Sequence, residues 1–237
     1  MNESSRIIGG QAADENSIPW QVALVWKGHS IPFCGGTILC SRFILTAAHC
    51  TLGNGITPSS IEIIAGEHDT NIVDKIDKAT RHKVKAIHTH STYVKHFETH
   101  RLYISTTAGG YDVSILELND PIDLSASSKA GAACLPDKND ASKFKKGKTN
   151  FVVSGWGMIW GGNKPSVLHH VTLPYVPHFP TLVKRTLESN WETPFNKIPK
   201  KYLDTMLVAG TVMPKGVSAC YGDSGGNIIS TTYLNRP

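Results

Sequence analysis

Three short segments of the sequence carry the side chains that nucleophilic catalysis needs. His49 lies in Thr46-Ala47-Ala48-His49-Cys50, Asp112 lies in Tyr111-Asp112-Val113-Ser114-Ile115-Leu116, and Ser224 lies in Gly222-Asp223-Ser224-Gly225-Gly226. A serine hydroxyl is a weak nucleophile at neutral pH, so it needs an adjacent base, and a histidine can take and return the proton. A carboxylate can fix the tautomer of that histidine and stabilise its cation. Each segment alone is typical of packing, capping or a loop, but together they favour a Ser–His–Asp triad.

The elements that would position these residues read as short strands. Period-two apolar runs lie at residues 20–26, 43–47, 61–65, 113–118 and 151–154, and glycine and proline turns separate them. Helical signal is weak, and its best candidate is residues 180–190. Many short strands with frequent turns predict an all-β fold.

Composition excludes several classes of protein. The 237 residues carry a formal charge of +5 with 18% charged residues, which argues against disorder. No apolar stretch approaches membrane-spanning length, and we expect neither a membrane nor a nucleic-acid partner. The basic run from Lys143 to Lys148 is typical of a solvated loop, and polyanion binding there is an alternative function.

Further segments resemble the chymotrypsin-like (trypsin-fold) serine proteases. Ile7-Ile8-Gly9-Gly10, Pro19-Trp20-Gln21-Val22, Cys34-Gly35-Gly36-Thr37-Ile38 and Ser154-Gly155-Trp156-Gly157 join the three catalytic segments in the family's order. The resemblance implies two antiparallel six-stranded β-barrels with the active site between them. We expect a propeptide remnant at residues 1–6, an N-terminal barrel half at 7–125 and a C-terminal barrel half at 126–237.

The resemblance also implies roles for individual residues. His49, Asp112 and Ser224 would be the catalytic triad of a serine endopeptidase, and the backbone amides of Gly222 and Ser224 would form the oxyanion hole. Peptide bonds would be hydrolysed through an acyl-enzyme, with protein or peptide substrates and protein protease inhibitors as partners. A catalytically inactive homologue that acts by binding or regulation is the alternative.

Activation is predicted to follow from cleavage after Arg6 by a trypsin-like protease. The new α-ammonium of Ile7 would pair with Asp223, as it does in the family. The resemblance therefore implies a secreted, extracellular zymogen, although no signal peptide leads this sequence.

Specificity depends in the family on the residue six before the catalytic serine, here Ser218. A serine would not select Arg or Lys by charge, so a chymotrypsin-like or elastase-like preference for apolar side chains is implied. Tyr221 is expected at the rim of that pocket.

Several positions depart from the family pattern. The resemblance implies a Cys34–Cys50 disulfide but leaves the pairing of Cys40, Cys134 and Cys220 open. Asn227 replaces the proline that usually follows the glycines. The family continues well beyond the position of Pro237, so we expect a truncated chain with an incomplete second barrel.

Two groups of side chains in the sequence are potential metal ligands. Glu67, Asp69, Asp74 and Asp77 could form a structural calcium loop or a merely solvated acidic one. No other cofactor is expected. Five histidines could bind zinc, but a long exposed insertion explains them more simply; they are His82, His88, His90, His96 and His100.

Overall fold

A closed antiparallel barrel forms the first half of the fold. The computed structural model describes residues 10–53, 55–72, 79–99, 110–137, 139, 143–144, 148–159, 162–176, 207, 209–210, 219 and 221–231. The barrel strands close in the order β2, β3, β4, β7, β6, β5. Their bounds are β2 Gln21–Trp26, β3 Pro32–Cys40, β4 Phe43–Thr46, β5 Ile61–Ala65, β6 Thr80–Thr89 and β7 Ser114–Leu118.

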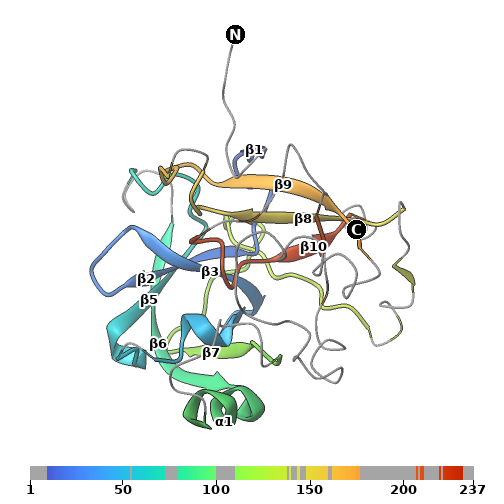
Figure 1. Ribbon diagram of the computed structural model, residues 1–237. Helices are drawn as coiled ribbons and strands as arrows, with labels where there is room; N and C mark the ends of the chain where they lie inside the picture. The colour runs from blue at the N-terminus through green and yellow to red at the C-terminus, as the bar shows by residue number, and fades with distance from the viewer. Residues whose placement is uncertain are drawn as a thin grey trace.

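A four-stranded antiparallel sheet forms the second layer, in the order β1, β9, β8, β10. It lies above the barrel in Figure 1 and draws its strands from both ends of the described chain. Their bounds are β1 Gln11–Ala12, β8 Asn150–Gly155, β9 His169–Pro174 and β10 Ile228–Ser230. The described helices are short: η1 Ala48–Cys50, η2 Pro58–Ser60 and α1 Ser91–Thr99. None of them is long and apolar enough to cross a membrane.

Strand β2 links the two layers because both of its faces are buried. Val22 and Leu24 point into the barrel core, whereas Ala23 and Val25 pack with Trp156, which follows β8. This explains why the alternation in β2 is apolar on both faces. The barrel and the segment that follows β8 therefore share a buried apolar contact.

The all-β prediction is confirmed, with one closed six-stranded barrel and a second, partial sheet. The five predicted strands are present, β5 with the predicted bounds and the other four with ends shifted by one residue. Strands β1, β6, β9 and β10 and helix α1 were not predicted from the sequence. In β6, lysine, arginine and histidine interrupt the apolar pattern. The exposed-insertion interpretation of the histidines is wrong for His82, which is buried in β6. The predicted helix at 180–190 lies outside the described residues, and the domain division at 125 stays a prediction.

Candidate active site

Pairing of strands β4 and β7 brings His49 and Asp112 together. Thr46, the last residue of β4, lies opposite Ser114, the first residue of β7. His49 follows β4 in the 3-10 turn η1, and Asp112 lies two residues before β7. Two residues 63 positions apart in the sequence thus reach the same end of the barrel.

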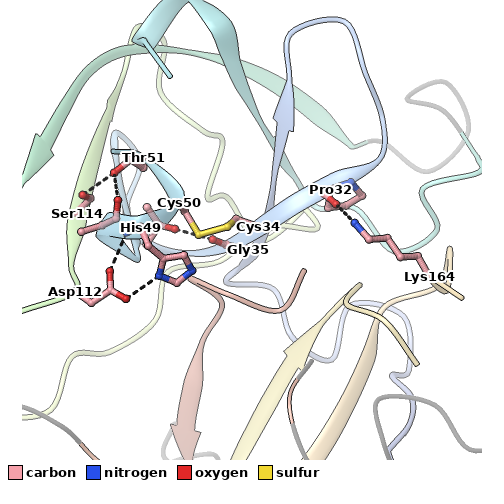
Figure 2. The surroundings of a disulfide bond; sticks show 11 residues. Pro32, Cys34, Gly35, His49, Cys50, Thr51, Asp112, Ser114 and Lys164 are labelled. Carbon is pink, nitrogen blue, oxygen red and sulfur yellow. Dashed lines mark hydrogen bonds and ion pairs between the residues drawn. A yellow bond between two sulfur atoms is a disulfide. The ribbon is translucent and has the colours of Figure 1, made fainter. Parts of the chain in front are cut away.

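The Asp112 carboxylate holds His49 through two hydrogen bonds. Its Oδ1 accepts the backbone N–H of His49 at 2.9 Å, and its Oδ2 lies 2.7 Å from the imidazole Nδ1. Figure 2 shows both contacts, with the Cys34–Cys50 disulfide on the far side of the imidazole. With Nδ1 donating to the carboxylate, Nε2 is the nitrogen that carries the lone pair in the neutral ring. The arrangement makes His49 an oriented base.

Three side-chain hydroxyl groups stabilise the backbone on either side of this contact. Thr51 Oγ1 donates to Ser114 Oγ at 2.8 Å, and Ser114 Oγ donates to Thr89 Oγ1 at 2.9 Å. The chain of hydroxyls joins η1, β7 and β6. It fixes the backbone that follows His49 against the backbone that follows Asp112.

The backbone immediately before Asp112 is strained. Tyr111 has a φ of 55°, in the left-handed region that a bulky side chain rarely adopts. Its ring stacks on His90, with centroids 4.6 Å apart and planes 10° from parallel. Non-glycine residues held in this region often lie at functional sites, where the surrounding structure maintains the strain.

The segment carrying Ser224 packs directly on the barrel end that carries His49. The Ser224 carbonyl accepts the backbone N–H of Gly35 in β3 at 2.7 Å. Gly225 has a φ of 76°, and a Cβ there would lie 3.0 Å from the backbone N of Ala47 and overlap Thr46 Oγ1. Glycine is therefore required at 225 both by the backbone conformation and by the close approach. The approach places Ser224 beside the segment that leads into His49.

Asp223 is buried beneath this segment, with 5% of its surface exposed. Its Oδ1 accepts the backbone N–H of Gly157 at 2.8 Å. A Cβ at either Gly155 or Gly157 would overlap the Asp223 carboxylate. The Ser-Gly-Trp-Gly segment thus supplies the space that this buried carboxylate occupies.

Two nearby residues were not singled out from the sequence. Tyr93 in α1 is buried, and this burial, together with the charge of Asp112, raises the pKa of its hydroxyl. Lys164 donates from Nζ to the carbonyl of Pro32 at 3.0 Å (Figure 2). The same Nζ would lie 3.6 Å from a Cβ at Gly222. No spacing signal distinguished either residue from an ordinary helix or loop position.

Comparison with known proteins decides the family. The trypsin family pattern matches residues 7–233. The chain belongs to the trypsin family. It is 33% identical over 226 residues to coagulation factor IX of Cavia porcellus, covering 95% of this chain and 67% of that protein. It is 32% identical over 228 residues to ovochymase-2 of Mus musculus, covering 95% of this chain and 32% of that protein. Membership of the trypsin family identifies this chain as a serine endopeptidase.

Other expected site residues of this trypsin-family chain are only partly described. Tyr221 is described and is 75% exposed, which suits a position at a pocket rim. Arg6, Ile7, Ser218 and Cys220 lie outside the described residues. Cys40 and Cys134 are exposed and are not joined to each other.

Of the four acids of the expected calcium loop, the structure describes two. Glu67 Oε1 accepts the backbone N–H of His68, and Asp69 Oδ1 accepts that of Asn71. Asp74 and Asp77 lie outside the described residues. Over the described ranges, the potential metal ligands that cluster are Cys34, His49 and Cys50, and the disulfide occupies both of those sulfurs.

Proposed function

We propose that this trypsin-family protein hydrolyses peptide bonds through an acyl-enzyme formed on Ser224, with His49 as the base and Asp112 as its orienting carboxylate. The observation that carries the proposal is the pair of hydrogen bonds that the Asp112 carboxylate accepts from the backbone N–H and the ring Nδ1 of His49. It supports the role of His49 because it commits Nδ1 to the carboxylate. The packing of Gly225 on Ala47 supports the role of Ser224.

The chemistry follows from these positions. Ser224 Oγ attacks the substrate carbonyl carbon, and its proton passes to His49 Nε2. The tetrahedral intermediate then breaks its C–N bond, and His49 returns the proton to the leaving amine. Water repeats the sequence to release the acyl group and restore Ser224 Oγ–H. The backbone amides of Gly222 and Ser224 are proposed to bind the oxyanion, where such donors contribute about 10²–10³ in rate.

Activation is proposed to occur by cleavage after Arg6. The α-ammonium of Ile7 would then pair with Asp223. The burial of Asp223 supports this step, because a carboxylate away from water requires a cation or several donors. The activating enzyme would be a trypsin-like protease, since the bond follows an arginine. Protein protease inhibitors as partners and an extracellular location are proposed together with zymogen activation, on the basis of membership of the trypsin family.

Specificity is proposed to favour apolar side chains before the scissile bond. Ser218 at the expected pocket base would offer no carboxylate to an arginine or lysine. Tyr221 would contribute an aromatic rim. A panel of peptide substrates that differ only at that position tests this: a preference for Arg or Lys would contradict it.

The catalytic proposal is tested by turnover. The chain cleaved after Arg6 should hydrolyse an apolar peptide ester, whereas the uncleaved chain and Ser224→Ala should not. Turnover by Ser224→Ala would contradict the role of Ser224. Absence of turnover in the cleaved, folded wild type would instead favour the inactive-homologue alternative.

Calcium binding by Glu67, Asp69, Asp74 and Asp77 is proposed only as a structural feature. A higher melting temperature with calcium than with a chelator is the expected result. An unchanged melting temperature would contradict it.

A further inference from the structure

A buried polar cluster joins the serine segment to both layers of the fold. Its members are Asn227, Gln21 in β2 and Ser154 in β8, with 4%, 2% and 0% of their surfaces exposed. Asn227 Nδ2 donates to Gln21 Oε1 and, at 2.8 Å, to Ser154 Oγ. Ser154 Oγ in turn donates to Gln21 Oε1 at 2.8 Å. The three side chains form a closed set of hydrogen bonds.

Asn227 stands three residues after Ser224, at the position where the resembling family usually has proline. A proline has no side-chain donor and could not make either contact. The cluster is therefore a feature of this chain that the family pattern does not supply.

The cluster lies next to the hydrogen bond from the Gly35 N–H to the Ser224 carbonyl, which positions the Ser224 backbone against the barrel. Gln21 Nε2 donates to the Val22 carbonyl at 2.9 Å, which fixes the orientation of the Gln21 amide. The same Nε2 would lie 2.9 Å from a Cβ at Gly35, the residue whose N–H binds the Ser224 carbonyl. Gly226 also approaches Gly35 closely, with its Cα 2.9 Å from that same Cβ position. A shift of Asn227 would thus be transmitted to Ser224 over three residues.

The unmatched atom of Asn227 argues that the side chain is not present for stability alone. Its Oδ1 is buried and has no hydrogen-bond partner in the part of the chain that the structure describes. A buried acceptor without a donor is destabilising, and each such group in a native structure calls for a reason. Removing the side chain would delete two hydrogen bonds and this unmatched acceptor together, so the two effects on stability oppose each other.

We propose that Asn227 is a positioning residue that holds the Ser224 segment in register with the barrel through Gln21 and Ser154. The proposal rests on the proposed function only for its effect on rate. It acts on Ser224 through the backbone, so it should change the reactivity of the serine more than the binding of substrate. Displacements of about 1 Å in a catalytic group can lower rates about a hundredfold.

The first test compares Asn227→Ala with the wild type after cleavage at Arg6. We expect kcat to fall about tenfold or more, with KM and the melting temperature nearly unchanged. Ser154→Ala should cause a smaller loss, and the double variant should be no worse than Asn227→Ala, because the groups act as one unit. The matched control is Ser230→Ala, a buried polar residue of β10 outside the cluster. Equal losses in Asn227→Ala and Ser230→Ala, or full activity of Asn227→Ala, would overturn the proposal.

The second test does not require activity. Amide hydrogen exchange at Gly35 reports on its bond to the Ser224 carbonyl, and the amide of Ile38, which binds the Trp20 carbonyl, is a control in the same strand. In Asn227→Ala the Gly35 amide should exchange about tenfold faster while the Ile38 amide is unchanged. Unchanged exchange at Gly35 would overturn the proposal even in a chain that shows no turnover, whereas absent wild-type turnover with faster Gly35 exchange would overturn only the proposed function.

Discussion

Replacing Asp112 by asparagine tests the role of the carboxylate with almost no change of shape. The carboxylate accepts two N–H groups of His49, from the backbone at 2.9 Å and from Nδ1 at 2.7 Å. An amide has one acceptor oxygen, so one of these donors must face an NH₂ group. If the oxygen stays on the backbone N–H, the ring must place its proton on Nε2 and can no longer accept one from Ser224.

The size of the expected loss in kcat follows from the other orientation of the introduced amide. Keeping the active tautomer turns the amide NH₂ toward the backbone N–H of His49 and leaves a partly buried donor unmatched, at a cost of about 1–3 kcal/mol. That cost depletes the active form about 5- to 150-fold. The lost negative charge, which stabilises the imidazolium, brings the expected fall in kcat to about 10⁴, or about 5.4 kcal/mol.

The assay is the acylation rate of the cleaved chain with a chromogenic ester, with the melting temperature measured in parallel. Asp123→Asn is the matched control, because that exposed carboxylate accepts from the backbone N–H and the hydroxyl of Ser125, at 2.9 and 3.1 Å, and lies outside the candidate site. The control should keep wild-type activity. An Asp112→Asn protein that folds and retains activity within about tenfold of the wild type would show that the Asp112 carboxylate does not orient His49 for catalysis.

Three further predictions concern stability. Gly225→Ala should unfold the serine segment and abolish acylation, because its Cβ would overlap the barrel; Gly28→Ala, with a similar φ of 78° but open space, should cost only about 1–2 kcal/mol of unfolding free energy, and equal effects would contradict this. Burial lowers the pKa of His82 below 6.5, so its stabilisation is present above pH 6.5 and lost as the pH falls through the folded-state pKa. His82→Gln should therefore flatten the fall in melting temperature between about pH 7.5 and about pH 5, and an unchanged slope would contradict it. Replacing Cys34 and Cys50 together by alanine removes a bond across 16 positions and should cost about 3 kcal/mol in urea unfolding, and an unchanged midpoint would show that the bond does not stabilise the fold.

The sequence predicted those parts of the fold where the local pattern and the tertiary role agree. Strand β5 is apolar at every position except Glu62, and its bounds were predicted correctly. Strand β6 was missed because its outward residues are basic and its inward His82 is polar, so no two-residue alternation of apolar and polar types is visible. The buried state of His82 depends on strands far away in the sequence.

The residues of the candidate site also fall into those that the sequence could predict and those that it could not. His49 and Asp112 could be found because their residue types are chemically informative, and strand pairing brings them into contact. The cluster of Gln21, Ser154 and Asn227 could not be found, because amides and hydroxyls are common and only the packing of two layers brings these three together. The left-handed backbone of Tyr111 likewise has no signal in its residue type.

Covalent labelling of Ser224 is a direct test of whether Ser224, His49 and Asp112 form a working catalytic triad. The chain cleaved after Arg6 is treated with a fluorophosphonate, digested and mapped by mass spectrometry, with Ser224→Ala and Asp112→Asn as controls. The proposed triad predicts a single adduct on Ser224 in the wild type, none in Ser224→Ala and strongly slowed labelling in Asp112→Asn. Two results would contradict the proposed triad: a folded, cleaved wild-type chain that takes up no probe at Ser224, or an Asp112→Asn variant that is labelled as fast as the wild type.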